Sequence, residues 1–126
     1  MITKIVPVLG TIVLIGAIIQ VAFGLEITWM SLDSLQGVHA LIGIMGLILV
    51  LGLMVIAIRA KAPNAIKITM LILVVLVLIQ VGLGMQLLGG ADEFGPPHEA
   101  NGILIVILSL LTGGLTMMNA RRQKAV

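Results

Sequence analysis

The sequence of 126 residues contains no cysteine. This absence excludes disulfides, thiolate metal sites, cysteine nucleophiles and covalent c-type haem attachment. Charged residues are also scarce, at 10% of the chain, whereas 60% of the residues are hydrophobic. A soluble domain of this length could not hide so much apolar surface, because small domains leave a large share of their chain in water. The composition therefore predicts an integral membrane protein whose main partner is the lipid bilayer.

Four long hydrophobic runs, at about residues 5–27, 38–58, 66–88 and 98–118, predict four transmembrane helices. Each run has the roughly 20 residues that a helix needs to cross a hydrocarbon layer of ~30 Å. Lipid offers no partners to free backbone groups, so the spans must be helical. The expected fold class is an all-α membrane protein, a four-transmembrane-helix bundle that forms one domain over residues 1–126.

The charged residues are sorted to opposite ends of these spans. The cations are Lys4, Arg59, Lys61, Lys67, Arg121, Arg122 and Lys124, and the acids are Glu26, Asp33, Asp92, Glu93 and Glu99. Cytoplasmic loops carry the lysine and arginine excess, so both termini and the 59–67 turn are predicted to be cytoplasmic, in the cell membrane. The cations form no stripe, so no nucleic acid partner is expected. No charge lies at mid-depth, which argues against a transporter or channel.

The two halves of the chain, about residues 1–62 and 63–126, repeat one pattern. Each half reads Gln-Val-x-x-Gly near the end of its first helix and His-x-x-x-Gly at the start of its second. The repeated residues are Gln20, Gly24, His39 and Gly43 in the first half and Gln80, Gly84, His98 and Gly102 in the second. Two halves that run in the same direction form a parallel repeat about an axis along the membrane normal. We therefore expect His39 and His98 to face each other near the outer surface.

A histidine inside a membrane span is costly and points to a functional site. Two imidazoles on facing helices can supply both axial ligands of a low-spin haem b. The glycine four residues after each histidine lies on the same helix face and leaves space for a porphyrin. The other two glycines could do the same, with a glutamine one turn deeper. The predicted cofactor-binding residues are therefore His39, His98, Gly43, Gly102, Gln20, Gln80, Gly24 and Gly84, with the two histidines as iron ligands.

Each of these residues also has a plainer interpretation. A histidine at the interface can cap a helix, and glycines four residues apart allow close helix packing in lipid. The two glutamines can bond each other across helices. Met45 and Met85 lie at a usable depth but are not assigned as ligands. A zinc or copper ion held at the outer surface by the histidines and nearby acids is a weaker alternative. A protein without any cofactor is also left open.

In residues 37–43 and 79–84 the chain resembles one four-helix half of the haem A synthase family. Those proteins have eight spans in two halves, and each half carries a histidine on its second and fourth helices. The resemblance implies that His39 and His98 are the axial pair of one haem b near the outer face. It also implies electron transfer or haem handling as the function.

The chain departs from that family in ways that argue against catalysis. Gln36 stands where the catalytic half has a glutamate, and Ala40 stands where an arginine often follows the histidine. The outer-loop cysteine pair of many members is absent. We therefore expect no haem A synthesis by this chain alone and assign no catalytic residue. The alternative function is an accessory subunit, without cofactor, of a larger respiratory or oxygenase membrane complex. A homo-oligomer is also left open.

Overall fold

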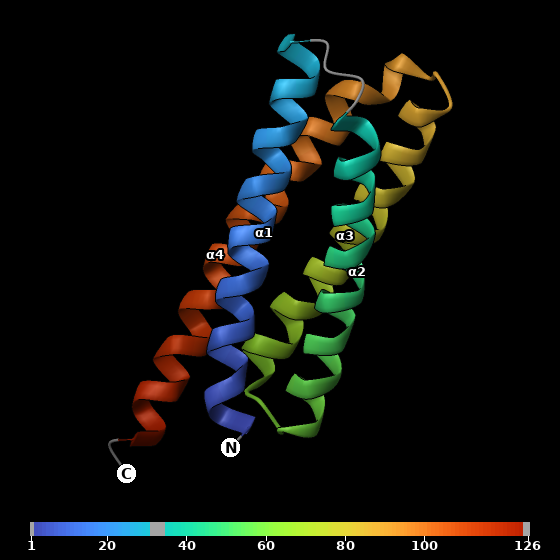
Figure 1. The fold of residues 1–126 in the computed structure, drawn as a ribbon. Helices are drawn as coiled ribbons and strands as arrows, with labels where there is room; N and C mark the ends of the chain where they lie inside the picture. Colours follow the sequence, from blue (N-terminus) through green and yellow to red (C-terminus); the bar gives the residue numbers. More distant parts are fainter. Residues whose placement is uncertain (1, 31–34, 125–126) are drawn as a thin grey trace.

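The computed structural model describes residues 2–30 and 35–124, and these form four long α-helices (Figure 1). The elements in chain order are α1 (Ile2–Met30), α2 (Gln36–Arg59), α3 (Asn64–Leu88), the short 3-10 helix η2 (Asp92–Phe94) and α4 (Gly95–Lys124). The predicted all-helical fold is therefore confirmed. Among the described residues, α2, α3 and the stretch from Asp92 to Arg122 are long and apolar enough to cross a membrane, and α1 contributes a shorter apolar stretch.

The four helices form a bundle in which each helix packs against two others. Helices α1 and α3 each contact both α2 and α4. Consequently α2 and α4 lie diagonally across the bundle from each other. Helix α1 begins and α4 ends at the same end of the bundle, together with the turn between α2 and α3 (Figure 1). We call this the terminal end and call the opposite end, where α2 and α4 begin, the histidine end.

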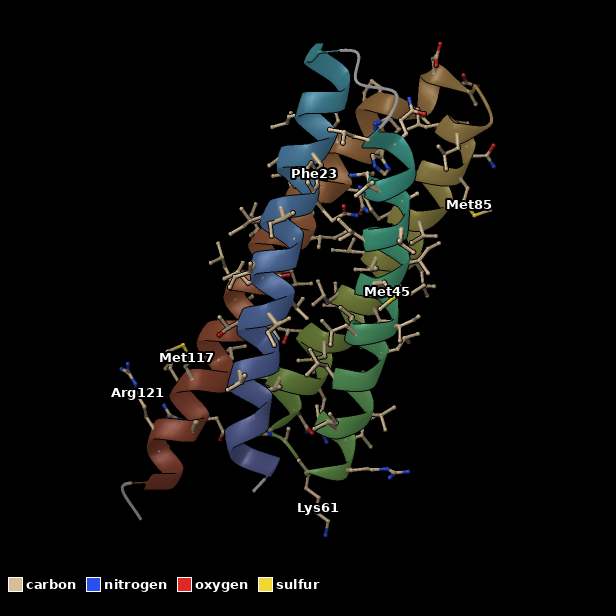
Figure 2. The ribbon with its side chains drawn as sticks, viewed as in Figure 1. Phe23, Met45, Lys61, Met85, Met117 and Arg121 are labelled. Atoms are coloured by element: carbon tan, nitrogen blue, oxygen red, sulfur yellow. The ribbon has the colours of Figure 1, made fainter. Side chains whose placement is uncertain are left out.

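The charged side chains follow this division. Lys61 and Arg121 lie at the terminal end (Figure 2). Asp92 and Glu93 belong to η2, at the histidine end. Large exposed side chains along the helices between the two ends are mainly aliphatic. An apolar belt between two charged ends is the surface that a bilayer requires.

The two described turns are closed by backbone hydrogen bonds and positive-φ residues. Lys61, with φ of 51°, follows α2, and Gly90, with φ of 86°, follows α3. Glycine adopts this conformation at no steric cost, whereas lysine does not. The predicted spans 66–88 and 98–118 leave residues 89–97 as a loop, but in the structure this loop is shorter because Pro96 and Pro97 lie in the first turn of α4. Proline fits there since its missing N–H has no partner within the helix.

The buried residues lie at alternating spacings of three and four, as in other helix bundles. On α3 this series is Ile66, Met70, Leu73 and Val77, with Val74 buried beside it, and on α2 it is Val50, Leu53 and Ala57. The same spacing continues from Val77 to Gln80 and Gly84, which places the repeated residues at the histidine end of the bundle seam. The buried polar residues lie on α4 and are Asn101, Ser109, Thr112 and Thr116. Most of the large buried apolar side chains therefore lie on α2 and α3, whereas α4 contributes Ile105 and the four polar residues.

Candidate functional site

His39 and His98 occupy equivalent positions, each the fourth residue of its helix. Their helices lie across the bundle from each other, and both side chains are partly buried. The ring centres are 5.9 Å apart, and the ring planes are inclined by 61°, an edge-to-face arrangement. The structure thus brings together the two imidazoles that the repeated pattern predicted to face each other.

Each imidazole lies against a glycine on the preceding helix. A Cβ atom built on Gly24 would be 3.6 Å from His39 Cε1, and one built on Gly84 would be 3.2 Å from His98 Cε1. The first distance is an ordinary van der Waals contact, whereas the second is tighter than most. The absence of a side chain at these positions therefore admits the histidine rings into the space between the helices.

Each glutamine lies against a glycine on the following helix in the same way. A Cβ on Gly43 would be 3.0 Å from Gln20 Nε2, and one on Gly102 would be 3.4 Å from Gln80 Nε2. All eight predicted residues therefore belong to one cluster, and the same two kinds of contact occur in both hairpins. In this structure imidazole and amide groups, rather than open space, occupy the glycine surfaces that we expected to face a porphyrin.

The α3–α4 hairpin links its polar groups into a chain of hydrogen bonds. Asn101 Nδ2 donates to the backbone oxygen of Leu76 at 2.9 Å and to Gln80 Oε1 at 2.6 Å. Gln80 Nε2 lies 3.1 Å from His98 Nε2. The sequence analysis missed Asn101, although an asparagine inside an apolar span, one turn after a histidine, is a signal for an interhelical hydrogen bond.

Among the described residues, the α1–α2 hairpin has no equivalent chain of side-chain hydrogen bonds. Gln20 Nε2 donates to the backbone oxygen of His39 at 3.0 Å, not to its ring. The residue three positions after His39 is Ile42, which has no polar side chain, where the second hairpin has Asn101. Each glutamine bonds within its own hairpin, so the described hydrogen bonds do not join the two glutamines to each other.

Three buried polar atoms near the histidine end have no hydrogen-bond partner among the described residues. They are Gln20 Oε1, His39 Nδ1 and His98 Nδ1. A buried donor or acceptor without a partner lowers the stability of the fold by about 1–3 kcal/mol. A ligand that made hydrogen bonds to these atoms would recover that free energy. One ring nitrogen of each histidine is in this state.

Other ligands for a metal are scarce around this pair. The part of the chain that the structure describes contains no group of three or more histidine, cysteine or acidic side chains placed so that they could hold a metal ion. Asp33, one of the acids considered for a zinc or copper ion, lies outside the described residues. Met45 and Met85 lie on the outer surface of the bundle, both more than half exposed (Figure 2). Structural zinc takes four protein ligands, so the two imidazoles alone do not make such a site.

No protein-family model, characterised protein or solved structure matches this chain. The similarity to half of a haem A synthase therefore depends on the short motifs around the repeated residues and stays a hypothesis. What the structure establishes is a helical bundle, with apolar helices suited to a bilayer, that carries two facing imidazoles at one end.

Proposed function

We propose that the protein binds haem b in the membrane, with His39 and His98 as axial ligands, and serves in electron transfer or haem handling. The separation of the imidazoles, 5.9 Å between ring centres, carries this proposal. Neutral imidazole is a common iron ligand, and rings this close need only local side-chain movement to reach one metal ion.

The residues around the pair fit such a ligand in number and type. Two neutral imidazoles from separate helices form a donor set that low-spin haem uses. His39 Nδ1 and His98 Nδ1 have no hydrogen-bond partner among the described residues, so one nitrogen of each ring is unsatisfied by the protein. When bound, the haem would supply one-electron chemistry through its iron, and the apolar bundle around it would influence the reduction potential.

Haem binding requires the side chains at the histidine end to move. The rings now contact each other and cover Gly24 and Gly84, while the glutamine amides cover Gly43 and Gly102. A porphyrin would reach the glycine surfaces only after these side chains had moved away. Its carboxylates would meet water or a partner subunit, because the lysines and arginines of the chain cluster at the other end of the spans.

The haem proposal is tested by the absorption spectrum of protein purified after expression with ample haem. We expect a Soret band and sharp α and β bands on reduction, lost in both His39→Ala and His98→Ala. Ser109→Ala is the matched control, because Ser109 is buried on α4 but does not belong to the histidine cluster. Colourless wild-type protein would refute haem binding and leave the accessory-subunit function.

We further propose that the terminal end is cytoplasmic and that the hairpins are related by an axis along the membrane normal. The recurrence of the glycine contacts in both hairpins supports the repeat, and Lys61 and Arg121 at one end support the orientation. Because the chain has no cysteine, single Lys61→Cys and Glu93→Cys variants report the topology without background. An impermeant maleimide added to intact cells should label only the Glu93→Cys variant; labelling of only the Lys61→Cys variant would reverse the orientation.

A further inference from the structure

We propose that Asn101 and Gln80 hold His98 in the neutral form that carries its proton on Nδ1, so that the paired histidines are chemically unequal. The starting point is the backbone oxygen of Leu76, a group that can only accept hydrogen bonds. The side-chain atom of Asn101 that lies 2.9 Å from it must therefore be the amide nitrogen. The reverse orientation of Asn101 would set two oxygens against each other.

The identity of the next atoms follows from the first. The Asn101 amide nitrogen also lies 2.6 Å from the end of the Gln80 side chain. That atom must accept, so it is Gln80 Oε1, and the Gln80 nitrogen faces the other way. The orientation of a glutamine amide is normally inferred from its neighbours. For Gln80 it is set by the backbone carbonyl of Leu76, to which Gln80 is linked by two successive hydrogen bonds through Asn101.

The Gln80 nitrogen faces His98 Nε2 at 3.1 Å. An amide nitrogen only donates, so His98 Nε2 must hold a lone pair rather than a proton. A neutral imidazole has one proton, and in His98 that proton is therefore on Nδ1. His98 presents a buried N–H with no acceptor among the described residues, and its lone pair is already engaged.

His39 is not held in this way. The amide nitrogen of Gln20 donates to the backbone oxygen of His39 rather than to its ring. Ile42 has no polar group that could orient the Gln20 amide. The consequence for the cofactor rests on the proposed function: Gln80 would compete with a metal ion for His98 Nε2, whereas Gln20 bonds the backbone of His39 and leaves its ring unoccupied by that amide. Asn101 is thus a positioning residue that acts on His98 through Gln80.

The experiment is nitrogen NMR of the haem-free protein labelled with ¹⁵N-histidine, because protonated and unprotonated ring nitrogens have well separated shifts. The chain has two histidines, so a His39→Gln variant assigns the signals of His98. We expect His98 of the wild type to be protonated on Nδ1. In both Asn101→Leu and Gln80→Leu the proton should move largely to Nε2, the form that unconstrained imidazole favours. Ile42→Leu, the matched control on α2, should leave His98 unchanged.

Two results would overturn the proposal. Wild-type His98 with its proton on Nε2 would do so directly, and besides the wild type only the assigning His39→Gln variant has to fold. A His98 that keeps its proton on Nδ1 in both leucine variants would show that Asn101 and Gln80 do not set it. The sample holds no haem, so a failure of the cofactor proposal leaves this result unaffected, and the two proposals fail separately.

Discussion

The two hairpins, α1–α2 and α3–α4, place the same residue types in the same contacts, but the hydrogen bonds of their polar side chains differ. In both, an imidazole covers a glycine of the preceding helix and an amide covers a glycine of the following one. In the second hairpin Asn101 completes a chain of hydrogen bonds to His98, whereas in the first Gln20 Oε1 has no described partner. The comparison separates two properties: glycine packing positions the rings, and one additional amide decides how one of them is protonated.

The largest difference between the hairpins should appear on removing the additional amide. Asn101→Leu leaves Gln80 Oε1 without its donor in a buried setting, which should destabilise the protein by about 1–3 kcal/mol. Ile42→Leu, the equivalent change in the first hairpin, conserves volume and should cost less than about 1.5 kcal/mol. Equilibrium unfolding in mixed detergent micelles measures both. Equal losses would show that the hydrogen-bond chain does not distinguish the hairpins.

The histidine-facing glycines should respond unequally to a methyl group. Gly84→Ala places a Cβ 3.2 Å from His98 Cε1, whereas Gly24→Ala places one at 3.6 Å from His39 Cε1. The first substitution forces a ring held by Gln80 to shift and should cost about 1 kcal/mol. The second should be close to neutral. A greater loss of unfolding free energy for Gly24→Ala would contradict the geometry of the pair.

The glutamine-facing glycines should show the opposite order. Gly43→Ala brings a Cβ to 3.0 Å from Gln20 Nε2, and Gly102→Ala brings one to 3.4 Å from Gln80 Nε2. The end of a glutamine side chain can yield, so we expect the loss for Gly43→Ala to stay below about 1 kcal/mol. The loss for Gly102→Ala should be smaller still. The same unfolding measurement is made on all four glycine variants. It tests whether the histidine contact is the tighter one in the second hairpin and the glutamine contact is the tighter one in the first.

A comparably small effect should come from making the first hairpin resemble the second. Ile42→Asn puts an amide at the position equivalent to Asn101, where it can donate to the unpartnered Gln20 Oε1. Interhelical hydrogen bonds in membranes contribute about 0.6 kcal/mol on average, so we expect stability to change by less than about 1 kcal/mol. A loss of 2 kcal/mol or more, about the cost of a buried unpaired amide, would show that the hairpins are not superimposable at this position.

The helices and the meeting of the histidines could be predicted from the sequence because both depend on features along the chain. Long apolar runs define the spans, and the repeat of His39 at His98 implies equal depth. The start of α4 could not be predicted, since Pro96 and Pro97 suit a loop and a first helical turn alike. Nor could the glycine contacts, because they join different helices and depend on interhelical register.

The role of Asn101 illustrates the same limit. Its partners, Leu76 and Gln80, are 25 and 21 residues away in the sequence and lie on another helix. Only the packing of α3 against α4 brings them within hydrogen-bond distance. The polar face of α4 was missed for a related reason. A serine or threonine can satisfy its hydroxyl within its own helix, as Thr112 does by donating to the backbone oxygen of Leu108.

The central claim is that both histidines hold one iron. It is tested most directly by haem titration monitored through the low-spin absorption bands. The titration compares the wild type with His39→Ala, His98→Ala and the double variant. Because both rings would act on the same metal ion, their effects should not add. We predict that each single variant loses the low-spin bands and that the double variant loses nothing further. Full low-spin bands in either single variant would contradict the claim.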